Sequence, residues 1–134
     1  MNPASLVEEA RAALANAHAP YSNFPVGAAL LGENGRVYRG TNVENASYGL
    51  SVCAERAAVF AAVADGERRF RALAVATDTD APTPPCGACR QILREFVEDL
   101  PVYLAGRRKT RETTLARLLP DPFVPPRTPA KDGG

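Results

Sequence analysis

Cys53-Ala54-Glu55, followed further along the chain by Pro85-Cys86-Gly87-Ala88-Cys89, contains every cysteine of this 134-residue sequence. Together, the two stretches contain three potential thiolate ligands and one carboxylate. A catalytic zinc ion takes three protein ligands and keeps its fourth position for water. Cys53, Cys86 and Cys89 match that count, and Glu55 is a group that can accept and return a proton of that water. The pattern therefore predicts a catalytic zinc site with its own proton carrier, in which a metal-bound water can be activated.

The expected helices place these ligands. Cys86 and Cys89 are three positions apart at the start of a helix predicted over residues 87–98, so both sulfurs can face one metal ion. Cys53 lies near the start of a second helix, predicted over residues 52–64 with Ser51 as its N-cap. The free N–H groups and the positive end of each helix would both favour thiolates.

The charge of such a site needs compensation. Three thiolates and one Zn²⁺ sum to −1, and a neighbouring cation can offset that charge by donating to sulfur. Arg56, directly after Glu55, is the first candidate for this role, and Arg90 is the second.

Two plainer interpretations compete with a catalytic site. Buried cysteines are common in protein cores, so each cysteine taken alone is more often structural than a ligand. The stronger competitor is a closed structural zinc site with His18, the single histidine, as fourth ligand. We favour the catalytic interpretation because His18 lies far from both cysteine stretches and because a structural site leaves Glu55 without a purpose.

Composition limits the class of protein. The length suits one compact domain, and the formal net charge is +1 with no basic run longer than Arg107-Arg108-Lys109, so we expect no nucleic-acid partner. No apolar run approaches the roughly 20 residues that span a bilayer, and the N-terminus lacks the pattern of a signal peptide, so we expect no membrane association. An odd number of cysteines argues against a disulfide framework, and free thiols indicate a cytoplasmic protein.

Periodicity and turn signals predict the order α-β-β-α-β-α-β-(β)-α. The expected elements outside the two cysteine helices are a helix at 3–17, a hairpin of strands at 26–31 and 36–43, strands at 71–77, 102–105 and 108–113, and a short helix capped by Thr114 and ending at Leu119. The strand–helix–strand units after the hairpin favour a mixed sheet, parallel in its second half and covered by helices.

With these motifs in place, the sequence resembles the small, homotetrameric cytidine deaminases over about residues 3–123. The resemblance rests on residues 19–22, 24 and 26–29, on Gly40-Thr41-Asn42-Val43-Glu44-Asn45-Ala46, on Cys53-Ala54-Glu55-Arg56 and on Pro85-Cys86-Gly87-Ala88-Cys89-Arg90-Gln91. It implies an α/β/α sandwich around a five-stranded mixed sheet, a homotetramer with one zinc ion per subunit, and a single deaminase domain at residues 1–123. The proline-rich tail at 124–134 matches nothing, and His18 stands where the family often has an aromatic residue.

The resemblance also implies a role for individual residues. Phe24 would pack against the pyrimidine ring, Asn42 and Glu44 would bind the ribose hydroxyls, and the Ala54 backbone with the Glu55 side chain would read the edge of the base. Tyr48 and Phe123 would contribute to the active site of a neighbouring subunit. The plainer alternatives are a loop phenylalanine for Phe24, a polar turn for Asn42 and Glu44, and a tail residue docked on its own subunit for Phe123.

The implied reaction is hydrolytic deamination of cytidine and 2′-deoxycytidine to uridine and 2′-deoxyuridine, a step of pyrimidine salvage. Three rivals remain open: a deaminase of blasticidin-type nucleoside antibiotics, a polynucleotide cytosine deaminase, and a non-catalytic zinc-binding module. The Asn42-Val43-Glu44 segment favours cytidine over the first, and the near-neutral charge and small size disfavour the second.

Overall fold

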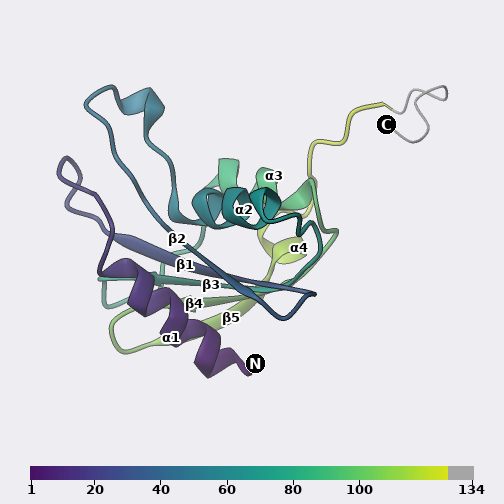
Figure 1. Ribbon diagram of the computed structural model, residues 1–134, viewed down its shortest axis with the longest axis horizontal. Coiled ribbons are helices and arrows are strands. Elements are labelled where there is room, and N and C mark those ends of the chain that lie inside the picture. The colour runs from purple at the N-terminus through teal and green to yellow at the C-terminus, as the bar shows by residue number, and fades with distance from the viewer. Residues whose placement is uncertain (127–134) are drawn as a thin grey trace.

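Five strands form one mixed sheet in the order β2-β1-β3-β4-β5 in the computed structural model, which describes residues 1–126 (Figure 1). The strands are β1 (Val26–Gly32), β2 (Val37–Thr41), β3 (Phe70–Thr77), β4 (Pro101–Ala105) and β5 (Thr110–Thr114). The helices are α1 (Pro3–Leu14), α2 (Ala54–Ala64), α3 (Gly87–Arg94) and α4 (Leu115–Leu118), with a 3₁₀ turn, η1, at Tyr48–Leu50.

The helices cover both faces of this sheet. Helix α1 lies alone on one face, whereas α2, α3 and α4 lie on the other (Figure 1). Small side chains of β1 and β3 pack with Leu6, Val7 and Ala10 under α1, and a larger cluster that includes Leu30, Leu73 and Leu93 fills the space under α2 and α3. The predicted three-layer α/β/α sandwich is confirmed. Within residues 1–126 no helix combines the length and hydrophobicity needed to cross a bilayer.

The sheet differs in one respect from its prediction. Strands β1 and β2 form the predicted antiparallel hairpin, whose turn contains Gly35 at φ +84°, a conformation that glycine adopts without strain. Strand β3 pairs antiparallel with β1 and parallel with β4. However, β5 runs antiparallel to β4, so the second half of the sheet is not parallel throughout. The four residues between β4 and β5 are too few for a parallel crossover, which needs a dozen or more.

Three helix boundaries also differ from those predicted from the sequence. Helix α1 ends at Leu14 rather than at residue 17, and the chain then turns so that His18 pairs with Val43. The N-cap of α2 is Cys53 itself, not Ser51. Helix α3 ends at Arg94 instead of near residue 98, and the Phe96 ring after it packs 5.5 Å from the ring of Phe70. Two of the three changed boundaries thus coincide with a tertiary contact, at His18 and at Phe96.

The predicted cap of α4 is confirmed. The Thr114 side chain accepts a hydrogen bond from the Arg117 N–H at 3.2 Å. After α4, residues 119–126 have no regular secondary structure. Residues 127–134, which make up most of the predicted proline-rich tail, lie outside the described residues.

Two glycines let helices approach the sheet closely. A Cβ on Gly27 would collide with the α1 backbone at Ala10, and a Cβ on Gly40 would collide with the α2 backbone at Ala54 and Ala58. The contact at Gly40 brings the first turn of α2, with its functional residues, directly against strand β2.

Candidate metal centre and substrate pocket

The three cysteine sulfurs converge at the N-terminal ends of two helices. All three Sγ atoms lie within 4.8 Å of one another, with Cys53 and Cys86 3.7 Å apart and Cys86 and Cys89 3.3 Å apart. Thiolates bound about 2.3 Å from a tetrahedral zinc ion stand about 3.8 Å apart. The spacing and the donor set therefore fit one zinc ion with three thiolate ligands.

This cluster contains no fourth protein ligand among the described residues. It consists of the three cysteines alone, and His18 is not part of it. The backbone of His18 instead pairs with Asn42 and Glu44, through the bonds His18 N–H to Asn42 O and Glu44 N–H to His18 O. The closed zinc site with His18 is therefore wrong.

The helix ends supply the favourable field expected for thiolates. Cys53 and Cys86 are the N-cap residues of α2 and α3, so the unpaired N–H groups of both first turns surround the cluster. The Arg56 Nη2 donates to the Cys53 sulfur at 3.5 Å, as predicted. Arg90, the second candidate, does not take this role: its guanidinium donates to two carbonyl oxygens, those of Pro85 and Leu118.

The thiols differ in their readiness to ionise. The pKa of Cys53 is lowered to about 5 because the Cys89 thiol, and after it Arg56, donates a hydrogen bond to its sulfur. The pKa of Cys89 is raised because that thiol donates to Cys53 and because it is completely buried. The metal-free cluster thus holds protons that a metal ion must displace when it binds.

Glu55 is a buried carboxyl group beside the sulfurs. Its side chain is 4% exposed, and burial raises its pKa to about 7, with the negative charge of Cys53 acting in the same direction. A carboxyl group with a pKa near neutrality can both accept and donate a proton at physiological pH. This is the property required of a proton carrier.

A cavity of about 350 Å³ opens beside Glu55 and the metal ligands. Seven of the predicted site residues line it: Phe24, Asn42, Glu44, Cys53, Ala54, Glu55 and Cys86. They come from the loop before β1, the segment after β2 and the starts of α2 and α3. Cys89 lies behind this wall, fully buried. The structure therefore brings together the metal cluster and most of the predicted substrate contacts in one pocket.

Asn42 and Glu44 both hold the loop that carries Phe24. The Asn42 side chain accepts from the Val26 N–H at 2.9 Å and donates to the Phe24 carbonyl oxygen at 2.8 Å. The Glu44 carboxylate accepts from the N–H groups of Tyr21 and Ser22, both at 3.0 Å, and from the Ser22 hydroxyl. These bonds lower the pKa of Glu44, the Ser22 hydroxyl first among them. Both side chains thus shape one wall of the pocket.

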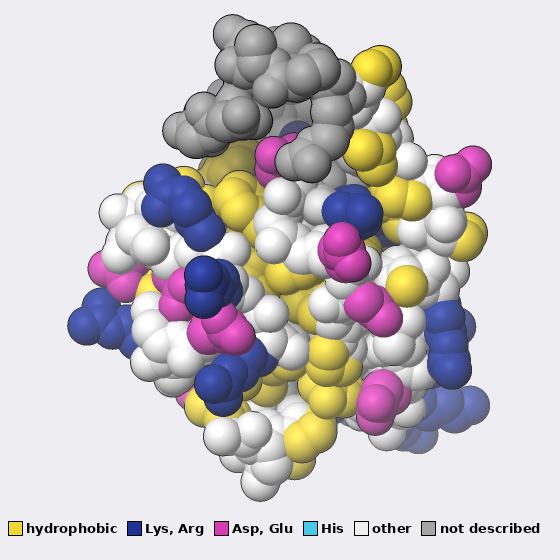
Figure 2. All heavy atoms as spheres, turned by 90° about the vertical axis from the view of Figure 1, so that its right-hand side faces the viewer, with side chains coloured by type: hydrophobic (Ala, Val, Ile, Leu, Met, Phe, Trp, Pro, Cys, Tyr) yellow, Lys and Arg dark blue, Asp and Glu magenta, His cyan; other side chains and the backbone are white. Residues whose placement is uncertain are grey.

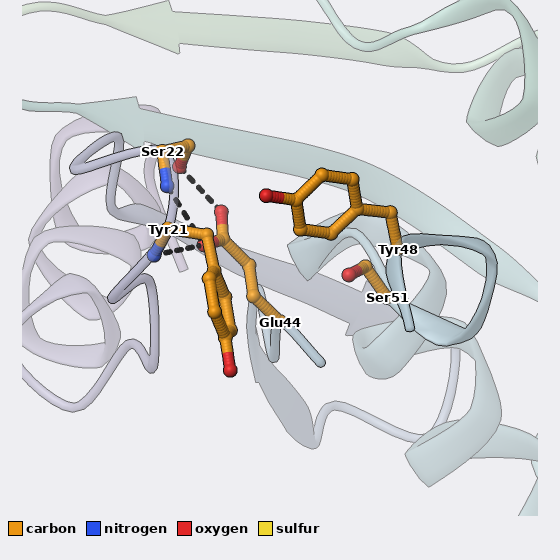
Figure 3. A pocket seen from close by; sticks show the side chains of 5 residues that line it. All are labelled: Tyr21, Ser22, Glu44, Tyr48 and Ser51. Atoms are coloured by element: carbon orange, nitrogen blue, oxygen red, sulfur yellow. Dashed lines mark hydrogen bonds between the residues drawn. The ribbon is translucent and has the colours of Figure 1, made fainter. Parts of the chain in front are cut away.

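A second, shallower cavity of about 280 Å³ adjoins the first and shares Ser22 and Glu44 with it. Figure 3 shows Glu44 turning its carboxylate toward the backbone of Tyr21 and Ser22, with the Tyr48 ring across the opening. The rings of Tyr21 and Tyr48 meet edge to face with centroids 5.8 Å apart. Tyr48 therefore lies outside the catalytic pocket of its own chain and is 73% exposed.

Phe123 lines neither of these two cavities. Its side chain is 71% exposed, and its backbone is bonded to Gln91 of helix α3. The segment of residues 119–126, yellow in Figure 1, lies at the opposite end of the helical layer from the loops that carry Tyr21 and Tyr48.

Several residues that line the catalytic pocket were not predicted from the sequence. They are Ser22, Val26, Val75, Thr77, Thr83 and Pro84. Thr77 ends a buried strand whose neighbour β4 runs parallel to it, and side chains at such strand ends often border ligand sites. The position of Thr77 was therefore a usable signal, whereas the lining by Thr83 and Pro84 depends on the path of an irregular loop.

Most of the chain is similar to known proteins. Residues 2–105 match the family described as "Cytidine and deoxycytidylate deaminase zinc-binding region". The chain is 51% identical over 125 residues to a cytidine deaminase of Sporosarcina psychrophila, with 92% of each chain covered. It is similar at 50% identity to a cytidine deaminase of Halalkalibacterium halodurans, covering 92% of this chain and 96% of that one.

Solved structures agree with the sequence matches. The crystal structure of cytidine deaminase from Burkholderia pseudomallei superposes with a TM-score of 0.88 at 50% identity, covering 92% of this chain and all of the other. Cytidine deaminase from Mycobacterium tuberculosis superposes with a TM-score of 0.80 at 42% identity, covering 92% of this chain and 98% of that one. With its convergent thiolates and buried glutamate, the chain belongs to the family of zinc-dependent cytidine and deoxycytidylate deaminases.

Proposed function

We propose that this protein catalyses the hydrolytic deamination of cytidine and 2′-deoxycytidine to uridine and 2′-deoxyuridine, with release of ammonia, in pyrimidine salvage. The observation that carries the proposal is the position of Glu55. This buried carboxyl group lines a cavity together with Cys53 and Cys86, two of the three convergent cysteines, and with an aromatic ring and polar side chains. The similarity to cytidine deaminases over 92% of the chain points to the same substrate class.

Cys53, Cys86 and Cys89 would hold the zinc ion, which when bound lowers the pKa of water to roughly 7 in favourable sites and so provides a nucleophile. Glu55 accepts one proton of that water and delivers it to N3 of the cytosine ring as the C4–O bond forms. The same carboxyl group then passes the second proton to the exocyclic nitrogen, and the C4–N bond breaks to release ammonia. Its pKa of about 7 suits both directions of transfer.

The rest of the pocket would hold the nucleoside. The Phe24 ring packs on the pyrimidine, and the Ala54 backbone with Glu55 reads the edge of the base. Asn42 and Glu44 keep unused hydrogen-bonding capacity after binding the Phe24 loop, since a carboxylate has about four acceptor sites and an amide has two donors and an acceptor oxygen with two lone pairs. They can therefore also bind ribose hydroxyls. A cavity of about 350 Å³ suits a small ligand and not a polynucleotide.

Substitution of the proton carrier tests the proposal. We expect Glu55→Ala to lose turnover of cytidine by at least about 10³-fold, with zinc content and melting temperature retained. Glu98→Ala, a substitution of an exposed glutamate, is the matched control and should behave as the parent protein. The readout is the ultraviolet change as cytidine becomes uridine, with zinc measured on the same samples. Ammonia release at the parental rate from Glu55→Ala would show that another group carries the proton.

The same assay separates the rival substrates. Turnover of a blasticidin-type antibiotic without turnover of cytidine would replace the proposed substrate. If the zinc-loaded, folded parent protein turned over neither substrate, a non-catalytic zinc-binding module would be favoured. Deamination of single-stranded DNA in preference to the free nucleoside would favour the polynucleotide enzyme.

We also propose a homotetramer whose active sites are completed by Tyr48 and Phe123 of neighbouring subunits. The support is the exposure of large apolar side chains that a monomer would normally cover: Tyr48, Leu50, Phe60 and Phe123 are 53–73% exposed. Figure 2 shows apolar side chains reaching the surface in a band between charged groups on one face. Sedimentation of the zinc-loaded protein tests this, and a fully active monomer would contradict it.

The proposal assigns the catalytic domain to residues 1–123, and it places the enzyme in the cytoplasm, where a reducing environment keeps thiolate ligands free.

A further inference from the structure

The arm that follows helix α4, residues 119–124, is fastened to helix α3 by side chains and not by secondary structure. The Gln91 amide nitrogen donates to the Phe123 carbonyl oxygen at 3.0 Å, and the Phe123 N–H donates back to the Gln91 amide oxygen at 3.2 Å. One side chain thus satisfies both polar groups of one backbone unit, as a neighbouring strand would. The arm needs such a partner because its backbone forms no ladder of its own.

Leu118, the last residue before the arm, is held by Arg90, which directly precedes Gln91. The Arg90 guanidinium donates to the Leu118 carbonyl oxygen at 2.7 Å and, through Nε, to the Pro85 carbonyl oxygen at 2.8 Å. Pro85 immediately precedes the ligand Cys86, and Arg90 immediately follows the ligand Cys89. Helix α3 therefore carries, in three consecutive positions, a metal ligand and the two anchors of the arm.

The Phe123 side chain gains nothing from this arrangement within its own subunit. It stays 71% exposed, and the neighbouring Val124 is 61% exposed, although the backbone at Phe123 is bonded on both sides. The backbone that carries this exposed ring is already ordered in the free subunit. Binding to another surface would therefore lose less conformational entropy than binding by a flexible segment. Aromatic rings presented in this manner are frequent anchors of interfaces.

We propose that Gln91 is a positioning residue: it holds the arm in register with the metal-bearing helix α3 so that the Phe123 ring is presented to the active site of a second copy of the chain. This inference rests on the proposed tetramer with shared sites. It makes Gln91 act on catalysis only through Phe123 of the same chain, and hence on the neighbouring subunit and not on its own pocket.

Hydrogen exchange in the arm tests the clamp without any turnover. In Gln91→Leu, which keeps an apolar side chain of similar length but has no amide, we expect the peptide that covers residues 119–124 to exchange faster than in the zinc-loaded parent. The control, Arg94→Leu, alters the same helix at a residue that makes no hydrogen bond to the arm among residues 1–126, and it should leave the exchange unchanged. Equal exchange in Gln91→Leu and the parent would overturn the proposal.

A double-mutant cycle with Phe123→Ala tests the route of the effect. Loss of a positioned interface ring should raise the KM for cytidine by about tenfold or more, and Gln91→Leu should raise KM by about threefold to tenfold, each with kcat within about twofold of the parent. The double variant should have the KM of Phe123→Ala alone, because Gln91 has nothing left to position. Multiplying effects, or a fall in kcat and zinc content in Gln91→Leu, would mean that Gln91 acts on the metal centre instead.

Failure of the clamp and failure of the proposed function give different results. A parent protein that does not deaminate cytidine contradicts the proposed function, while the exchange measurement still decides whether Gln91 holds the arm. A Phe123→Ala variant with parental KM contradicts the shared site and, with it, the role given to Gln91.

Discussion

At the scale of single residues, the least expected feature is how fully the polar side chains of the pocket are already engaged. Glu44 accepts three hydrogen bonds from Tyr21 and Ser22, and Asn23 between Ser22 and Phe24 adopts the left-handed conformation at φ +54°. Asparagine tolerates this conformation better than most residues. The loop is thereby turned so that Phe24 lines the pocket. The carboxylate that we propose as a ribose contact thus also holds the loop.

The lowered pKa of Glu44 predicts a stability difference that depends on pH. A carboxyl group whose pKa is lower in the folded protein contributes stability above its unfolded pKa, about 4.5, and loses it as pH falls through the folded value. We therefore expect Glu44→Gln to melt below the parent protein at neutral pH, with a difference that shrinks below pH 4.5. Melting curves of both proteins at several pH values measure this. A difference that stays constant from pH 7 to pH 3 would show that the ionised form is not what binds the loop.

At the scale of elements, the position of α2 depends on the absence of one side chain. Gly40 lies in β2 directly under the Ala54 carbonyl and the Ala58 N–H. These atoms belong to the turn that also carries Glu55 and follows Cys53. The packing between β2 and α2 therefore sets the distance between Cys53 and the sheet.

An added methyl group at Gly40 should disturb both stability and chemistry. We expect Gly40→Ala to lower the free energy of unfolding by about 1–3 kcal/mol through overpacking and to reduce kcat, since the first turn of α2 must move away from the sheet. Gly49→Ala is the matched control, because nothing lies within 4 Å of a Cβ there. Denaturant unfolding and cytidine turnover are the measurements. Parental values for both in Gly40→Ala would mean that the helix does not need this close approach.

At the scale of the whole molecule, the metal site joins two helices that the core also joins. Cys53 begins α2, whereas Cys86 and Cys89 belong to the start of α3. The apolar cluster beneath these helices, which includes Val59, Leu73 and Leu93, does not include the sulfurs. The fold should therefore survive without zinc, though with less stability.

Removal of zinc should give a folded protein of lower melting temperature and no activity. Binding at a hundred to a thousand times Kd contributes about 3–4 kcal/mol, which corresponds to a fall of about 10 °C or more. A strong zinc chelator, circular dichroism and readdition of one equivalent of zinc measure this, with a calcium-selective chelator as control. Complete unfolding of the metal-free protein, or an unchanged melting temperature, would contradict the division between core and metal site.

Predictions from the sequence were better for the chemical groups of the site than for the contacts that surround them. The three-layer fold was predicted correctly, and so were the convergence of the three cysteines and the contact of Arg56 with Cys53, because each rests on local spacing or on a shared family pattern. The role of Glu55 as proton carrier stays a prediction. The predicted helix ends and the predicted parallel pairing in the second half of the sheet were wrong, because packing and loop length outweigh local preference there. The second candidate for the sulfur contact, Arg90, was wrong because its guanidinium is bonded instead to two carbonyl oxygens, 5 and 28 positions away in the chain.

By itself, then, the sequence determined which sulfur and carboxyl atoms could hold a metal ion and carry a proton, because cysteine and glutamate spacing within a turn of helix survives any global arrangement. Only the tertiary structure decided what those atoms lie beside. It buried Glu55 and so raised its pKa to about 7, it bound Asn42 and Glu44 to the Phe24 loop, and it fastened the arm to Gln91. These are contacts between residues far apart in the chain, and their energies depend on burial and distance, which no local pattern encodes.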